Sequence, residues 1–405
     1  MNEELKLTDE ARIDSCAVVP DDTAECSFLP PEERIEDAPV AEVAADSAVL
    51  ATEPVTPDPY VFDKYEKKRA KKIVSRTFLG VFFYWIIIQG AALILSLLCS
   101  AIIVVWFGES GIEFLSSGSY TMLLQLICYG IALPIFFAIT KNIPRAQTPK
   151  KNKLPFGQFM IFLLISWATM IIGSYLSSLT DVVLTYMYGL PVNNAVDSFI
   201  SNTPLWLMTV VVVIVGPIVE ELIFRKVMID RLSIFGDRAA ILISAIAFGL
   251  FHGNLSQLFY ATLVGLLFGY VYARTRRIWN SIFLHMIVNF LGSVIPLIGQ
   301  WAVDNIARLG NDITLLTPEE QSLYALSETV ALAATALQAG VFIAGLVFLI
   351  IYLAKRKFKV SHSCEIPIPG KERAGVFLAN PGVILFLVIC AILIAASLGM
   401  SIISY

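Results

Sequence analysis

Nine apolar stretches follow one another along this chain, and together they limit the folds open to it. A helix needs about 20 apolar residues to cross the hydrocarbon core of a bilayer, and most of these stretches reach that length. Because lipid offers no partners for backbone polar groups, each stretch is expected to satisfy its own groups as an α-helix. We therefore predict an all-α, polytopic integral membrane protein with about nine transmembrane helices. The stretches cover approximately residues 78–107, 120–140, 156–178, 205–224, 239–252, 258–273, 278–299, 327–353 and 376–404.

The composition agrees with this class of protein. Of the 405 residues, 57% are hydrophobic and only 15% are charged, which lies outside the range of soluble globular domains. The six cysteines include no C-x-x-C pair, so the sequence suggests neither a disulfide framework nor a thiolate metal site. Charged residues lie mainly between the apolar stretches, and no nucleic acid partner is expected.

The start of the chain has a different charge pattern. Residues 1–60 hold 16 Asp and Glu residues against 3 Lys and Arg residues. Such a segment buries too little apolar surface to offset the entropy lost on ordering. We predict a disordered acidic cytoplasmic tail over residues 1–62 and a basic juxtamembrane segment over residues 63–77.

Basic residues recur in alternate connections between the stretches. They gather from Lys64 to Arg76, again from Lys141 to Lys153, and after the fourth stretch, where we expect a loop. Since Lys and Arg collect on the cytoplasmic side, this pattern predicts a multi-pass protein of the cell membrane with a cytoplasmic N-terminus. Membrane lipids are then expected partners. The basic residues placed in the loop after the fourth stretch are Arg225, Lys226, Arg231 and Arg238.

A few polar side chains lie inside the stretches or at their ends. Ionisable groups near the middle of a bilayer cost several kcal/mol, so each is a candidate functional residue. The candidates are Glu220, Glu221, His252, His285 and Asn289. Such groups also serve as hydrogen bonds between helices or as proton relays, so a structural role for any single one stays open.

Spacing along the helices orders these candidates. Adjacent residues point about 100° apart, so Glu220 and Glu221 cannot face the same target. Arg225 lies four residues after Glu221 and is expected to pair with it. His285 and Asn289 are also four apart and share one helix face. A peptidase needs a base for water, an acid for the leaving amine and donors for the oxyanion, and this set can fill those roles.

Three short motifs carry a resemblance to a known family. In order and separation they resemble the motifs of the CAAX protease and bacteriocin-processing (CPBP, Abi) family of intramembrane endopeptidases, which includes type II CAAX prenyl endopeptidases. The resemblance covers approximately residues 156–299. The motifs are Glu220-Glu221-Leu-Ile-Phe-Arg225, Phe248-Gly-Leu-Phe-His252 and His285-Met-Ile-Val-Asn289.

The resemblance implies a glutamic-type endopeptidase that requires no cofactor. It implies that Glu220 and His252 act on the catalytic water and that His285 and Asn289 stabilise the oxyanion. The supporting members of the motifs are Glu221, Arg225 and Phe248. A peptide or membrane-protein substrate is expected, and a prenylated substrate is less favoured.

Two alternatives remain open at this stage. Glu220, His252 and His285 can instead be ligands of Zn²⁺ in a metalloprotease, although no H-E-x-x-H motif is present. The chain can also be a catalytically silent membrane scaffold or immunity protein. Metal analysis separates the first alternative, and tolerance of substitutions at Glu220 and His252 separates the second.

The predicted organisation has an N-terminal transmembrane pair with its loop over 78–155, the protease core over 156–299 and a C-terminal transmembrane pair with loops over 300–405. One difficulty concerns depth, because His252 ends its stretch whereas Glu220 lies near the cytoplasmic side. We expect the helix of the fourth stretch to continue past Arg225, which would bring Glu220, His252 and His285 to one level.

Overall fold

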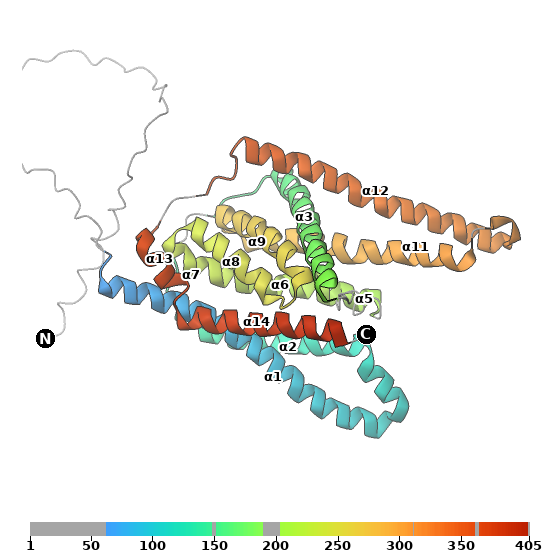
Figure 1. Cartoon of the computed structure of the whole chain (residues 1–405), viewed down its shortest axis with the longest axis horizontal. Helices are drawn as coiled ribbons and strands as arrows, with labels where there is room; N and C mark the ends of the chain where they lie inside the picture. Colours follow the sequence, from blue (N-terminus) through green and yellow to red (C-terminus); the bar gives the residue numbers. More distant parts are fainter. Residues whose placement is uncertain (1–61, 148–150, 189–202, 311, 361–363, 404–405) are drawn as a thin grey trace, which may run out of the picture. The chain divides into compact units, whose positions relative to one another are not determined.

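The computed structural model describes residues 62–147, 151–188, 203–310, 312–360 and 364–403, and within these ranges it is helical without a strand (Figure 1). The elements are α1 (Lys64–Ser116), α2 (Gly118–Thr140), α3 (Phe156–Tyr188), α5 (Leu205–Met208), η2 (Thr209–Val215), α6 (Gly216–Glu221), η3 (Leu222–Ile229), α7 (Asp230–Leu232), η4 (Ser233–Phe235), α8 (Asp237–Phe251), α9 (Leu255–Thr275), α10 (Ile278–Asn289), η5 (Phe290–Val294), α11 (Ile295–Leu309), η6 (Ile313–Leu315), α12 (Pro318–Ala354), α13 (Gly370–Phe377) and α14 (Pro381–Ile403). The predicted all-α fold is confirmed.

Each predicted apolar stretch contains a helix, but the described part of the chain has 8 helices long and apolar enough to span a membrane. The stretch that differs is 239–252, which forms α8. This helix has 15 residues and is therefore about 22 Å long, which is short of a full crossing. Eight of its residues are buried, so α8 packs inside the protein with its neighbours. The prediction of nine spans counted this internal helix as a crossing.

The outer helices pack in two groups around the helices from the middle of the chain (Figure 1). On one side α3 packs against α9 and α12, and α12 also packs against α11. On the other side α1 packs against α2 and α14. Between these layers lie α8, α9 and the helical run from α5 to η4, so the elements that carry the candidate residues occupy the centre of the fold.

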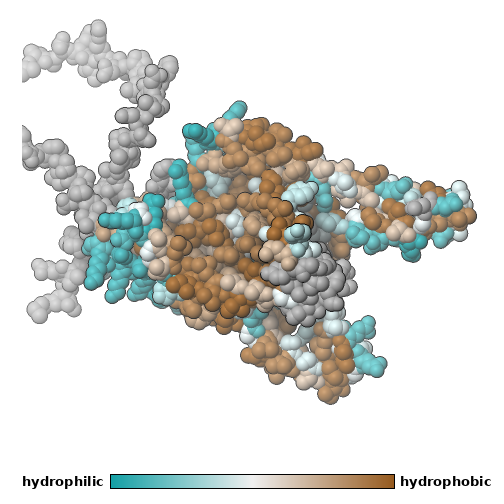
Figure 2. Space-filling view, in the orientation of Figure 1, coloured by the Kyte–Doolittle hydropathy of each residue, from teal (hydrophilic) through white to brown (hydrophobic). Residues whose placement is uncertain are grey.

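Hydrophobic residues, drawn brown in Figure 2, cover the body of the molecule on the face shown. Large apolar side chains face outward, including Leu97 at 63%, Trp106 at 78% and Leu332 at 72% exposure. An apolar patch this large marks a surface that lipid covers. Hydrophilic residues gather where α1 begins, and we call this the basic end of the bundle.

The fourth stretch continues as one helical span from Leu205 to Phe235, as expected from the depth argument. The expected loop after it is wrong: Arg225 is completely buried, Arg231 is 8% exposed, and only Gly236, with φ +100°, separates this span from α8. Arg225 and Arg231, which we expected in a loop, are tolerated inside the protein because each has buried partners.

The same span contains two π-helical segments, η2 and η3, which flank α6. In η2 the N–H of Gly216 donates to the carbonyl of Val211, five residues back. The next residue is Pro217, which has no N–H, so the carbonyl of Val212 lacks its donor in this register. The helix that presents Glu220 and Glu221 therefore starts at a defect in its own backbone bonding.

A tight turn joins α8 to α9 at the break predicted from Gly253 and Asn254. Gly253 has a φ of +68°, and the Asn254 side chain accepts a hydrogen bond from the N–H of Gln257 at 2.9 Å, which caps α9. The two helices approach closely, because a Cβ on Gly249 would lie 2.7 Å from the carbonyl oxygen of Leu258. This packing fixes the end of α8, where His252 stands.

The remaining domain boundaries stay predictions. The proposed acidic tail lies outside the described residues, except for Phe62. The basic juxtamembrane segment is the beginning of α1, since that helix starts at Lys64. Inside α1 the backbone departs from helical geometry at Gly108, one residue after the predicted end of the first stretch.

Candidate active site

Three buried side chains from two separate helices form one group with Glu221 at its centre. Its Oε1 lies 3.2 Å from Nη1 of Arg225, four residues later on the same helix. The same oxygen lies 3.0 Å from Nδ1 of His285 on α10. The side chains of Glu221 and Arg225 have no exposed surface, and that of His285 is 6% exposed. The pair predicted from spacing is present, and it also holds a histidine 64 residues away.

Arg225 is enclosed by aromatic rings instead of water. Its guanidinium carbon lies 4.4 Å from the ring centroid of Phe248 and 5.5 Å from that of Phe268. Such cation–π contacts stabilise a desolvated cation by about 2 kcal/mol. Sequence reasoning placed Phe248 in a supporting role, and it missed Phe268, which has no spacing relation to the motifs.

Glu220 points away from Glu221, as adjacent helical residues must. Its side chain is 20% exposed, and its Oε2 lies 3.6 Å from Nε2 of His285. The imidazole thus has one carboxylate at each nitrogen. Because the Glu221 carboxylate accepts, Nδ1 of His285 carries a proton and donates to it, which leaves Nε2 directed toward Glu220.

His252 ends α8 beside this pair of carboxylates. Its Nδ1 lies 2.8 Å from the carbonyl oxygen of Phe248 and donates to it, so Nε2 is the nitrogen with a free lone pair. The ring meets that of Phe248 edge to face at 4.8 Å between centroids. The ring of Phe248 also lies 5.8 Å from that of His285, so the two imidazoles border the same phenyl ring.

Asn289 contacts a backbone group and none of the other candidates. Its Nδ2 donates to the carbonyl oxygen of Val212 at 2.9 Å, the carbonyl that Pro217 leaves without a donor. The amide therefore repairs the defect at the start of α6. One amide hydrogen is engaged in this way, and the predicted role of Asn289 toward an oxyanion stays a prediction.

Two tyrosines in the core around the site were missed by sequence reasoning. Tyr84 on α1 is buried in the core cluster that contains Phe248, and Tyr129 on α2 packs against that cluster. The ring of Tyr84 lies 5.6 Å from that of Phe136 and 6.1 Å from that of Phe251. A tyrosine inside an apolar stretch carries little cost, so neither charge nor spacing distinguished these two residues.

Within the described ranges, no three His, Cys, Asp or Glu side chains lie close enough together to hold one metal ion. Glu220, His252 and His285 do not form a ligand set in this geometry. Glu221 nevertheless orients His285 in the way that carboxylates orient histidine ligands. The zinc alternative therefore stays a prediction for metal analysis.

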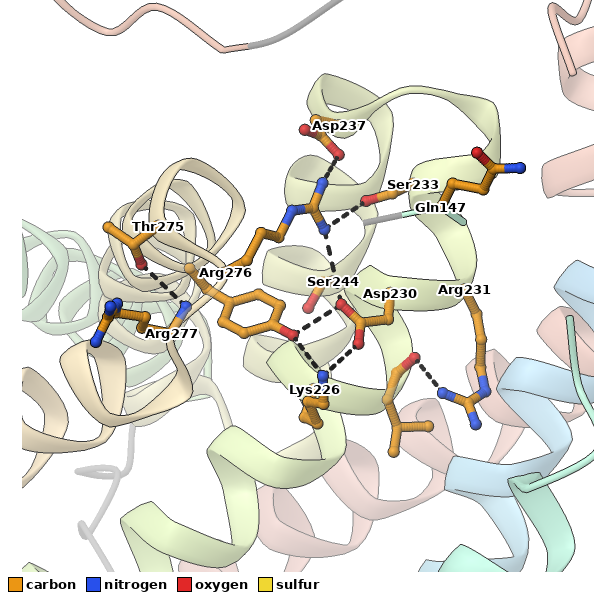
Figure 3. Close-up of polar contacts among 12 residues, drawn as sticks. Gln147, Lys226, Asp230, Arg231, Ser233, Asp237, Ser244, Thr275, Arg276 and Arg277 are labelled. Atoms are coloured by element: carbon orange, nitrogen blue, oxygen red, sulfur yellow. Dashed lines mark hydrogen bonds and ion pairs between the residues drawn. The ribbon is translucent and has the colours of Figure 1, made fainter. Parts of the chain in front are cut away.

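A second group of polar side chains lies on the same helical span, toward the basic end (Figure 3). Oδ2 of Asp230 lies 2.8 Å from Nζ of Lys226, and Oδ1 accepts from the hydroxyl of Tyr272 at 2.7 Å. Arg276 lies 3.7 Å from the same Oδ1 and also pairs with Asp237. We call these five residues the Asp230 cluster. It joins η3, α7, α8 and α9.

Comparison with known proteins places the candidate residues inside a matched region. The family model described as Type II CAAX prenyl endopeptidase Rce1-like matches residues 202–291, which include all three motifs. No solved structure matches the chain.

Two curated bacterial proteins are similar to this chain. The Bacillus subtilis (strain 168) protein named "Putative membrane peptidase YdiL" is 31% identical over 177 residues, which are 41% of this chain and 68% of that protein. The Staphylococcus aureus (strain USA300) "Membrane-embedded CAAX protease MroQ" is 26% identical over 222 residues, 50% of this chain and 84% of that protein. Both names describe membrane peptidases. With its motifs, its helical fold and these relatives, this chain belongs to the CAAX protease and bacteriocin-processing family of membrane proteases.

Proposed function

We propose that this chain is an intramembrane endopeptidase in which Glu220, assisted by His252, activates water to hydrolyse a peptide bond. The observation that carries the proposal is the placement of His285 between two neighbouring carboxylates. Glu221 is buried and fixed by Arg225, whereas Glu220 keeps 20% of its side chain exposed. One carboxylate thus orients the histidine, and the other is open to a water molecule.

The proposed reaction uses these groups in turn. Glu220 takes a proton from water as the oxygen attacks the scissile carbonyl carbon, and Nε2 of His252 accepts a hydrogen bond from the same water. His285 donates to the developing oxyanion when its ring also carries a proton on Nε2. Glu220 then returns the proton to the leaving nitrogen as the carbon–nitrogen bond breaks. Glu220 ends the cycle ionised, and no cofactor takes part.

The arrangement of charge supports a direction in the membrane. The basic end of the bundle, where α1 begins, is proposed to face the cytoplasm, which places the N-terminus there. The substrate is proposed to be a peptide or a membrane protein, because the reacting groups lie among apolar helices. The name of the Staphylococcus aureus relative includes the words CAAX protease, and the matching family model is described as a CAAX prenyl endopeptidase, so a prenylated substrate is the second candidate.

The test compares protein termini in cells. Membranes from cells producing the wild-type chain or the Glu220→Gln variant are analysed by mass spectrometry of newly formed N-termini. We expect termini that depend on wild-type protein and vanish in Glu220→Gln. The matched control is Glu328→Gln, an exposed carboxylate on α12, which should leave the termini unchanged.

Two results would overturn the proposal. Identical termini in wild-type and Glu220→Gln membranes, in the presence of well-folded protein, would favour the scaffold or immunity role. Stoichiometric zinc in purified protein, lost in His285→Ala together with activity, would establish the metalloprotease alternative.

A further inference from the structure

A basic groove lies at the start of α1, away from the candidate active site. It has a volume of about 390 Å³ and is lined by α1 together with Asn142 and Pro144, which follow α2. Four cationic side chains project from successive turns of α1 into it. They are Lys68, Arg69, Lys72 and Arg76.

Most of the positive charge in the groove lacks a protein partner. Arg69 lies 3.4 Å from Glu66, but Lys68, Lys72 and Arg76 make no ion pair with any residue that the structure describes. Lys67 on the other side of α1 differs, because it pairs with Glu372 at 2.7 Å. Like charges on adjacent turns of a helix repel. A bound anion would relieve this repulsion.

The groove opens onto a surface that lipid covers. Arg76 is the last charged residue before the apolar part of α1, which begins at Phe78. On the same helical face, Phe83 is 43% exposed and Ile86 is 41% exposed. A molecule with a phosphate among the cations and acyl chains along Phe83 and Ile86 matches both halves of this surface.

We propose that this groove binds the head-group phosphate of an anionic phospholipid at the basic end of the bundle. Basic pockets at the cytoplasmic ends of transmembrane helices provide this chemistry, and each nearby cation strengthens binding about fivefold. A soluble phosphate shares the charge but cannot use the adjoining apolar face. The proposal is independent of the protease mechanism.

The test measures lipid binding to the full chain in detergent. Native mass spectrometry counts bound phosphatidylglycerol as its concentration rises, with phosphatidylcholine as the uncharged comparison. The variant Lys68→Gln/Lys72→Gln/Arg76→Gln should bind phosphatidylglycerol on the order of a hundredfold more weakly. If that variant does not fold, Lys72→Gln alone should weaken binding about fivefold. Phosphatidylcholine binding should not change.

The matched control removes three cations elsewhere at exposed positions after α12, in the variant Lys355→Gln/Arg356→Gln/Lys359→Gln. It should retain binding close to the wild type. Equal weakening in both triple variants, or unchanged binding in the groove variant, would overturn the proposal. Complete displacement of lipid by inorganic phosphate would also overturn it, because the groove would then be a site for soluble phosphate.

A second, independent observation concerns Tyr84. The residue is 1% exposed, and its hydroxyl has no hydrogen-bond partner among the described residues. A buried hydroxyl left unpaired costs about 1 to 3 kcal/mol. Its ring lies 6.1 Å from that of Phe251, the residue before His252, so Tyr84 packs beside the end of α8. The hydroxyl is thus kept next to the candidate site at a cost to stability.

We infer that the Tyr84 hydroxyl donates a hydrogen bond to an oxygen of the reacting substrate, which rests on the proposed function. Substrate would supply the partner that the free protein lacks. Tyr84 lies on α1, outside the matched residues 202–291, so the N-terminal helices would complete the active site.

The variant Tyr84→Phe tests this inference with two readouts on purified protein. We expect kcat to fall by on the order of tenfold or more, while thermal stability stays the same or rises. Tyr120→Phe is the control, since that hydroxyl is also buried without a partner among the described residues but its ring packs on Phe114, near the other end of α1. It should leave kcat unchanged.

Normal kcat in Tyr84→Phe would overturn the inference, and so would a loss of kcat that only follows a loss of folded protein. These results are separable from failure of the proposed function. If Glu220→Gln is inactive and Tyr84→Phe is normal, only the role of Tyr84 fails. If Glu220→Gln also cleaves normally, the proposed function fails.

Discussion

Two polar groups on one helical span show how a carboxylate with both oxygens paired differs from one that is partly open. Glu220 and Asp230 are ten residues apart, about 15 Å along the helix. Both oxygens of Asp230 have close partners, and its side chain is 2% exposed. Among the described residues Glu220 makes one ion pair, with His285 at 3.6 Å, and its side chain is 20% exposed. Glu220, the carboxylate that can still accept hydrogen bonds, is therefore the one that lies next to His285.

Glu221 is intermediate between these two carboxylates. It is completely buried and bonded through Oε1, but its Oε2 has no hydrogen-bond partner in the described part of the chain. Its position suits a residue that acts through His285 instead of touching substrate. The comparison therefore separates the carboxylate proposed to react, the one proposed to position His285 and a structural one on a single helical span.

The largest effect is expected from Glu220→Gln, which removes a base without changing shape. We predict a loss of turnover on the order of a hundredfold to ten-thousandfold, with thermal stability near that of the wild type. Asp230→Asn is the contrast, because it should lower thermal stability while the remaining folded protein turns over normally. Cleavage rates and melting temperatures of purified variants measure both. If Asp230→Asn abolished turnover in stable protein, the contrast would be wrong.

The next effect concerns the buried pair of Glu221 and Arg225. Glu221→Gln or Arg225→Met alone leaves an unpaired buried charge, so each should destabilise the protein by about 3 to 5 kcal/mol and also reduce activity. The double variant removes both charges and should recover much of the stability but not the activity, since His285 loses its orienting carboxylate. Denaturation in detergent measures the cycle. Additive losses of stability would contradict a direct pair.

A smaller effect tests the repair of the backbone defect at Pro217. Asn289→Ala removes the donor to the Val212 carbonyl and should cost about 1 to 2 kcal/mol. Pro217→Ala restores an N–H at the position that this carbonyl lacks. In that background, Asn289→Ala should cost clearly less. An equal cost in both backgrounds would show that the amide does not substitute for the missing N–H. A strong loss of turnover in both would favour its predicted oxyanion role.

The smallest effect lies outside the membrane, at Glu372 on α13. A hydrogen bond from Lys67 holds the pKa of this carboxyl below its ordinary value. The pair therefore stabilises the fold above the ordinary carboxyl pKa, and the contribution disappears as pH falls through the lowered pKa. We expect Lys67→Met to lower thermal stability slightly at neutral pH and to match the wild type in acid. A difference that persists in acid would assign the effect to packing.

Sequence patterns predicted most of the fold because lipid leaves few options to long apolar stretches. The helices, the turn at Gly253 and the continuation past Arg225 were all predicted. Length alone did not distinguish α8, which is buried among neighbouring helices, from a membrane crossing. Charge alone also misplaced Arg231, since basic residues between two apolar stretches look like part of a cytoplasmic loop.

The site was predictable only within single helices. Spacing paired Glu221 with Arg225, because both lie on one helix face. It could not pair Glu221 with His285, since that contact depends on how α10 packs against α6. The partner of Asn289 follows from a proline in another helix, and Tyr84 carries neither charge nor motif. These roles depend on contacts between helices. The periodic pattern within one helix does not reveal such contacts.

The central claim is that Glu220 activates water and does not itself attack the peptide bond. The direct measurement is repeated turnover of the identified substrate in ¹⁸O-labelled water, followed by mass analysis of the product and of the enzyme peptide containing Glu220. General-base catalysis puts ¹⁸O in the new product carboxylate and leaves Glu220 unlabelled. A nucleophilic Glu220 would form an anhydride whose hydrolysis labels its own carboxylate. Label in Glu220 would contradict the account.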